Sequence, residues 1–224
     1  MMKKTGYVLA TILMLVLAAF LLYEGWPVLL RFFDLIGRYM WVGIGIAVFF
    51  VLRYFAKKNR DWLETLSHEL THAVIAILFL REITSFQANK KNGVVWSRGA
   101  RWSEPFVALS PYCLPLFTYI MLIIWSLVAS RQLVGSHNHL WGIDLLVGIT
   151  LGFHFVCFKA QTGNHETDIT KFPTFFSYTY IWFFRLVNLL VILLCYMPAH
   201  KTGEPLKVWG AFWYLIEHFW KILF

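Results

Sequence analysis

The chain has 224 residues, of which 59% are hydrophobic and only 14% are charged. This composition excludes a disordered chain, because such chains are poor in apolar residues. It also argues against a compact water-soluble domain, because the apolar residues form long runs and a membrane-spanning helix needs about 20 of them. The net charge of +8 comes with Lys and Arg at the ends of these runs. Cations in that position hold loops at lipid head groups, so the lipid bilayer is an expected partner and nucleic acid is not.

Six apolar runs predict about six transmembrane helices, at residues 7–23, 39–56, 62–80, 106–129, 141–158 and 174–198. Residues 24–38 are apolar but carry four charged residues, Arg31, Asp34 and Arg38 among them, which favours a short interfacial helix. Pro111 and Pro115 are expected to kink the fourth run. The tail at 205–224 is aromatic and amphipathic, so we expect an interfacial helix there, with a seventh span as the alternative.

Residues 81–105 differ from the other linkers because their apolar residues lack a helical period. Residues 83–88 and 93–98 are typical of two short strands, and the turn between them ends in a glycine. The predicted fold is therefore an all-α polytopic membrane protein with a β-hairpin after the third run and amphipathic interfacial helices.

We expect a single membrane-embedded domain over residues 1–224. Its core spans about 60–198, with accessory helices over 1–56 and the interfacial helix at 205–224. If the cations of the predicted hairpin are set aside, Lys and Arg are more numerous on the side of the membrane that holds the N-terminus. The positive-inside rule then predicts a cytoplasmic N-terminus.

The third run contains His68-Glu69-Leu70-Thr71-His72, an HExxH motif. Positions i and i+4 of a helix share one face, so His68 and His72 can bind the same zinc ion. Glu69 is close enough to reach a zinc-coordinated water and take its proton as the water attacks a carbonyl. Ionisable residues inside a spanning helix are costly and usually functional. The motif therefore predicts a metal-dependent hydrolase, against the alternative of polar groups in a helix-packing network.

With this motif in a membrane helix, followed by a hairpin-like linker and further spans, the sequence resembles the site-2 protease family of intramembrane zinc metalloproteases over about residues 60–175. The segments FVALSPYCLP, IDLLVGITLGFH and HETDI add a likeness to a bacterial branch. The resemblance implies one zinc ion on two His and an Asp, and a Glu as general base. It also implies a membrane-protein substrate that is cut within its transmembrane helix, in regulated intramembrane proteolysis. A multi-pass protein of a bacterial inner membrane is the expected localisation.

The third zinc ligand is open, because the family's NPxP and LDG signature is absent. Asp144 opens the fifth run and occupies the place in the order of spans where the family puts its Asp. Asp168 lies in a polar segment that leads into the sixth run, as the family's Asp motif leads into a helix. We favour Asp168 and keep Asp144 as the alternative, with His154 or His165 as lesser options.

Four further residues are candidates for a place beside the zinc or the substrate: His154, His165, Asn138 and Arg185. His154 can orient a ligand or donate to an oxyanion, or simply bond to a neighbouring helix. Arg185 lies mid-run and must pair with a carboxylate or line a wet cavity. Asn138 can bind substrate backbone, although a polar loop explains it equally well. A non-catalytic metal-binding or scaffolding membrane protein is the alternative function, and the oligomeric state stays open.

Overall fold

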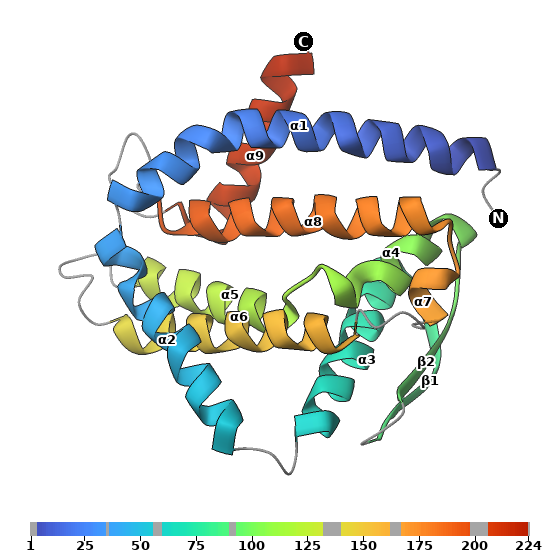
Figure 1. Cartoon of the computed structure of the whole chain (residues 1–224), viewed down its shortest axis with the longest axis horizontal. Helices are drawn as coiled ribbons and strands as arrows, with labels where there is room; N and C mark the ends of the chain where they lie inside the picture. Colours follow the sequence, from blue (N-terminus) through green and yellow to red (C-terminus); the bar gives the residue numbers. More distant parts are fainter. Residues whose placement is uncertain are drawn as a thin grey trace. The chain divides into compact units, whose positions relative to one another are not determined.

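The computed structural model describes residues 4–34, 36–55, 60–89, 93–131, 140–161, 167–197 and 206–223. The helices are α1 (Lys4–Asp34), α2 (Ile36–Phe55), α3 (Arg60–Leu78), α4 (Glu104–Leu109), α5 (Leu116–Arg131), α6 (Trp141–Gln161), α7 (Thr167–Thr170), α8 (Thr174–Cys195) and α9 (Lys207–Leu223). Two 3₁₀ turns, η1 (Arg101–Ser103) and η2 (Ser110–Tyr112), flank α4, and the strands are β1 (Glu82–Ala88) and β2 (Gly93–Arg98) (Figure 1).

Three helices in the described part of the chain are long and apolar enough to cross a membrane: Lys4–Arg31 of α1, Trp141–Phe158 of α6, and α8. A fourth candidate is the pair formed by Arg101–Tyr112 and Leu116–Ala129, which is bent by 84° at its break. The apolar part of α2 is shorter, and α3 does not qualify. The α-helical membrane class is confirmed, but the predicted count of six spans is not.

Helix α1 passes straight through most of the segment predicted as a separate interfacial helix. It continues to Asp34, and α2 begins at Ile36. Pro27 lies inside α1. A proline within a helix removes one backbone donor, but helices of membrane proteins tolerate this where neighbouring groups satisfy the freed carbonyl. The prediction of a short helix at 24–38 was therefore wrong: most of this stretch extends α1.

Pro111 and Pro115 break the fourth predicted run, as expected. Helix α4 ends at Leu109, η2 follows, and α5 begins only at Leu116. A proline has no backbone N–H, so it cannot bond to the carbonyl four residues earlier. For Pro111 that carbonyl belongs to Val107. It accepts a 2.9 Å hydrogen bond from Ser110 Oγ and keeps a second lone pair for another part of the chain.

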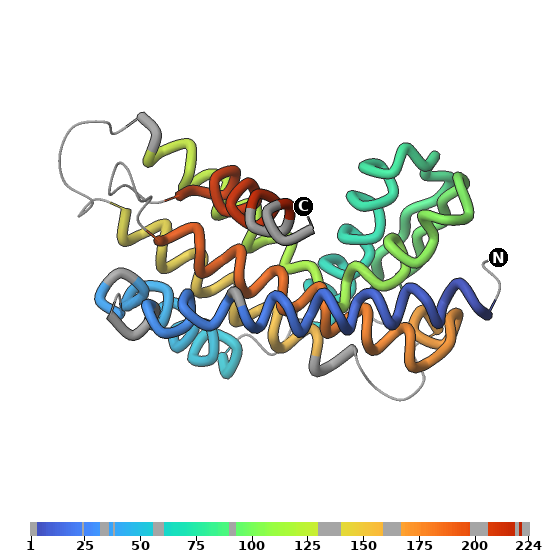
Figure 2. The backbone as a smooth tube through the Cα atoms, turned by 90° about the horizontal axis from the view of Figure 1, so that it is seen from above, coloured from blue at the N-terminus to red at the C-terminus, as the bar shows by residue number. Residues whose placement is uncertain are grey.

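The β-hairpin is confirmed. Its two strands pair antiparallel, from Glu82 opposite Arg98 to Ala88 opposite Gly93. The turn residues 90–92 lie outside the described part of the chain. Both strands and α4 contact α3, and these elements lie side by side in Figure 2.

By its contacts the chain divides into two compact units. The first comprises Met1–Ala19, Val51–Leu116 and His154–Arg185. Its core is rich in aromatic rings: Tyr7 of α1 packs edge-on against Phe176 of α8, with a centroid distance of 4.9 Å. The beginnings of these two helices accordingly run alongside each other (Figure 1).

The second unit comprises Phe20–Phe50, Phe117–Phe153 and Leu186–Phe224. Helices α2 and α6 approach closely in it, because a Cβ at Gly45 or Gly148 would overlap the backbone of the other helix. Small residues permit such backbone contact between membrane helices. The prediction that the chain forms one functional domain stays a prediction.

Candidate metal centre

The HExxH residues lie on α3, which is anchored in the first unit. Asp61 lies in the first turn, where a carboxylate is favourable at the positive end of the helix dipole. Glu64 accepts a hydrogen bond from Arg53 at 2.7 Å. The helix is also covered by the hairpin and by α4. The helical spacing of four brings His68 and His72 to the same face, with ring centroids 4.7 Å apart.

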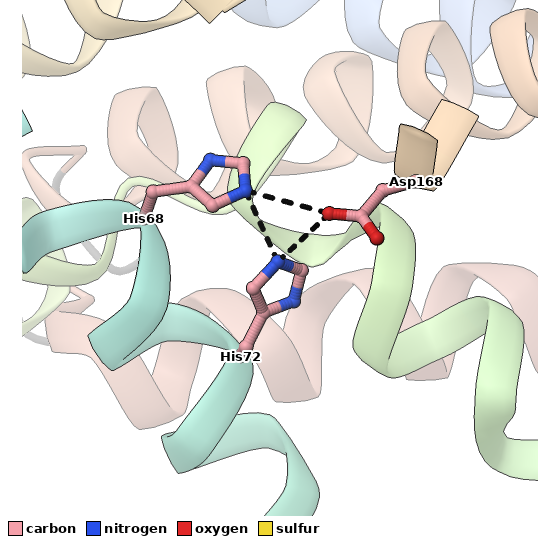
Figure 3. A group of neighbouring side chains, drawn as sticks. All are labelled: His68, His72 and Asp168. Atoms are coloured by element: carbon pink, nitrogen blue, oxygen red, sulfur yellow. Dashed lines mark hydrogen bonds and ion pairs between the residues drawn. The ribbon is translucent and has the colours of Figure 1, made fainter. Parts of the chain in front are cut away.

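Asp168 of α7 completes a group of three side chains with these histidines (Figure 3). The Nε2 atoms of His68 and His72 are 3.1 Å apart. Asp168 Oδ2 lies 3.2 Å from Nε2 of His72 and 3.6 Å from Nε2 of His68. In the described part of the chain, this is the one group of His, Cys, Asp or Glu side chains spaced to hold a metal ion.

The tautomer of His72 is set by a backbone carbonyl. Its Nδ1 lies 2.8 Å from the Val107 oxygen, which can only accept a hydrogen bond. Nδ1 must therefore carry the proton, and in the neutral ring Nε2 presents a lone pair. Val107 has this capacity because Pro111 cannot bond to it. The break in the fourth run thus orients a histidine on another helix.

The carboxylate of Asp168 lies among imidazole nitrogens. Burial raises the pKa of Asp168, but its hydrogen bonds with His68 and His72 and its contact with Lys171 outweigh this and hold the pKa well below its usual range. Asp168 is therefore ionised at neutral pH and accepts. Nε2 of His72, 3.2 Å away, can meet it in two ways: as the donor of an imidazolium, or as the lone pair of a neutral ring that shares a metal ion with the carboxylate.

The distances fit zinc. Ligand atoms about 2.0–2.2 Å from a tetrahedral zinc are about 3.3–3.5 Å from one another. The three separations of 3.1, 3.2 and 3.6 Å bracket that range. Two imidazoles and one carboxylate are also a common catalytic zinc set, which leaves the fourth position open.

Glu69 lies beside the group without belonging to it. Its side chain is 7% exposed. It lies within electrostatic reach of His68, His72 and Asp168. The first residue of β2 closes over it, because a Cβ at Gly93 would overlap Glu69 Oε1. The hairpin thus packs directly against the candidate general base.

Two residues, Tyr112 and Arg185, lie next to the group of His68, His72 and Asp168. Tyr112 of η2 packs its ring edge-on against His68, at a centroid distance of 5.3 Å. Its backbone carbonyl accepts a 3.0 Å hydrogen bond from Nε of Arg185, whose guanidinium lies 3.0 Å from the ring centroid of Phe158. Within the described residues, no carboxylate is found in a salt bridge with Arg185. The Arg185 guanidinium instead contacts the Tyr112 carbonyl and the face of the Phe158 ring.

The other predicted residues are not brought into the group. Asp144 lies in the second unit, against Tyr196 and Trp125. His154 of α6 lies in the first unit, near Arg185. Asn138 and His165 lie outside the described residues.

Sequence reasoning missed Val107 and Lys171. Val107 contributes only its carbonyl, and the available signal was Pro111 four residues later. Lys171 Nζ lies 2.6 Å from Asp168 Oδ1. The signal there was the spacing of three on a short helix, which places a Lys beside an Asp.

Comparison with known proteins gives one match. The family model described as Peptidase M50B-like matches residues 41–152, which is half of the chain. This stretch includes the HExxH motif, the hairpin and Asp144, and it ends before Asp168. No curated protein and no solved structure matches the chain.

Proposed function

The chain belongs to the Peptidase M50B-like family, and from this premise we propose that it is a zinc-dependent endopeptidase of the membrane. Its substrate is a membrane protein that is cut within a transmembrane helix, as in regulated intramembrane proteolysis. The observation that carries the proposal is the convergence of His68, His72 and Asp168, whose ligand atoms all lie within 4.8 Å of one another. Their spacing suits one zinc ion.

The residues have separate roles in this proposal. His68, His72 and Asp168 hold the metal, which when bound makes water acidic enough to act as a nucleophile near neutral pH. Val107 orients the His72 ring through Nδ1. Lys171 directs Asp168 by binding Oδ1, which leaves Oδ2 facing the histidines. Glu69 takes the proton of the attacking water and returns it to the leaving amine.

The test separates an enzyme from the alternative, a metal-binding or scaffolding protein. A panel of epitope-tagged single-span membrane proteins is co-expressed with the chain, and zinc is measured in the purified protein. Glu69→Gln should lower cleavage by about 10²–10⁴-fold, the usual contribution of a general base, and should leave zinc content unchanged. Glu82→Gln, an exposed residue at the start of β1, is the matched control and should cleave normally.

Either of two outcomes would contradict the proposal. Cleavage by Glu69→Gln at the normal rate would remove Glu69 from the mechanism. Zinc that stays bound after both His68→Ala and His72→Ala would remove the metal from this group.

We further propose a bacterial inner membrane with the N-terminus in the cytoplasm, as expected from the excess of Lys and Arg on that side when six crossings are counted and the cations of the hairpin are set aside. The prediction is that a cysteine placed at residue 2 is not labelled by a membrane-impermeant reagent added to intact spheroplasts. Labelling as strong as in lysed cells would show that the N-terminus lies outside the cytoplasm.

A further inference from the structure

A cavity of about 480 Å³ opens in the first unit, next to the metal ligands but not lined by them. Small-molecule sites commonly have about 300–1,000 Å³. The cavity lies between the start of α1, the segment from η1 into α4, and the loop that follows α7. The zinc proposal leaves it without a role.

The cavity has an apolar floor and a charged rim. Tyr7 and Phe172 are each 8% exposed, and Pro105 is also buried. At the rim, Arg101, Glu104 and Lys171 are exposed. Trp102, also in the lining, is 61% exposed. A ligand for this space is therefore amphipathic, with its charges at the mouth.

The rim lies where three apolar segments begin. Tyr7 is in the first turn of α1, and Phe172 comes two residues before α8. Both helices are candidate spans, and Arg101 begins the bent pair of segments that forms the fourth candidate. The ends of spanning helices lie in the head-group layer of a bilayer, where Trp, Tyr and cationic side chains are enriched. The cavity therefore opens at the depth of lipid head groups.

The charges at the rim suit a phosphate and an ammonium together. Arg101 and Lys171 offer the N–H donors that phosphate oxygens accept. Glu104 offers a carboxylate, which would repel a purely anionic head group but can accept hydrogen bonds from a primary ammonium. The rings of Tyr7 and Trp102 favour a cation beside them.

We propose that this cavity binds the head group of a zwitterionic phospholipid, with the phosphate on Arg101 and Lys171 and the ethanolamine ammonium on Glu104. Lys171 also contacts Asp168 Oδ1 at 2.6 Å. A bound phosphate therefore shares this cation with the carboxylate beside the metal. The site depends on the chain lying in a bilayer and not on its peptidase activity.

The first test measures lipid retained by the full chain after purification in detergent. The protein is incubated with equal amounts of phosphatidylethanolamine, phosphatidylcholine and phosphatidylglycerol, and bound lipid is counted by native mass spectrometry. Phosphatidylethanolamine should predominate. Arg101→Gln should lower its binding about fivefold, the effect of one partly exposed charge contact. Arg98→Gln, on the nearby end of β2 and outside the cavity lining, should leave it unchanged.

The second test addresses the ammonium. Glu104→Gln should remove the preference for phosphatidylethanolamine over phosphatidylglycerol, because the carboxylate that favours a cation and repels an anion is gone. A normal thermal melt of each variant verifies that it is folded.

Three outcomes would overturn the proposal. Equal loss of lipid with Arg101→Gln and Arg98→Gln would show a general charge effect. Displacement of the lipid by 10 mM inorganic phosphate would show a phosphate site without head-group recognition. Displacement by a soluble acidic peptide, with the same dependence on Arg101, would assign the cavity to a polypeptide.

Discussion

The two compact units each hold a carboxylate beside apolar helices, and the neighbours of these carboxylates differ in kind. Asp168 in the first unit faces Nε2 of two histidines, and these nitrogens bind metal ions when unprotonated. Asp144 in the second unit faces Tyr196 and Trp125, whose O–H and N–H groups can donate to it. A carboxylate among imidazole nitrogens can share a metal ion with them, whereas a carboxylate beside an O–H and an N–H has potential donors within the protein.

The two units also differ in how their helices pack. In the first unit, Pro111 interrupts a helix and frees the Val107 carbonyl for His72. In the second unit, Gly45 and Gly148 bring two helices into backbone contact. One unit therefore uses its irregular backbone to orient polar side chains, and the other uses small residues to pack regular helices. The neighbours of an ionisable residue, more than its burial, therefore distinguish a candidate metal site from a structural contact.

The largest expected effect tests the two carboxylates against each other. Asp168→Asn should weaken zinc binding by about a hundredfold or more, because loss of a neighbour that merely supports a ligand already costs about 10–100-fold. Asp144→Asn should leave zinc affinity unchanged, since Asp144 lies in the other unit and does not belong to the group. Competition with a chelator on the purified protein measures both. The reverse result would make Asp144 the ligand and would break the comparison.

The second-largest effect is expected from a change at the contact between the hairpin and Glu69. Gly93→Ala should lower cleavage by about 10–100-fold, because the added methyl displaces a carboxylate that must reach the attacking water. Zinc affinity should change little, because Glu69 is not one of the three proposed ligands. The Cβ would also overlap Cγ and Cδ of Glu69, so the whole side chain must shift, and a thermal melt checks that the variant stays folded.

Gly142→Ala is the control for this variant, because nothing lies within 4 Å of a Cβ at that position. Cleavage by Gly93→Ala at the control's rate would show that Glu69 is not held in place by the hairpin.

The smallest effect should appear in stability, with the metal centre unchanged. At Gly148 a Cβ would overlap the Val42 carbonyl, which belongs to a helix backbone and cannot move alone. Gly148→Ala should lower the free energy of unfolding by about 1–3 kcal/mol, as is usual for overpacking.

Gly142→Ala on the same helix should be neutral or slightly stabilising, because alanine favours helix more than glycine does. Thermal melts in detergent measure both variants, and zinc content per folded protein should stay constant. A loss of zinc in Gly148→Ala would link the close crossing to the metal centre.

The sequence by itself determined the features that depend on short spacings. The interval of four in HExxH places His68 and His72 on one helical face whatever the rest of the fold does. The two strand-like segments around a turn that ends in glycine, and the missing donor of Pro111, acted locally as well, so the hairpin and the broken fourth run were predictable. The motif in its apolar setting also identified the family, and the match to the Peptidase M50B-like model confirms it.

Only the tertiary structure decided which distant residues meet. Asp168 is 96 positions from His72. The sequence alone left both Asp168 and Asp144 open as the third ligand. The order of spans favoured Asp144, and the polar residues of the surrounding segment favoured Asp168. Contacts across such a separation depend on how whole helices pack, which residue type and spacing do not specify. The count of six spans is not confirmed for a related reason. Apolar runs occur in buried helices as well as in spanning ones, and α3 carries the polar residues of the candidate metal centre in place of part of its apolar surface.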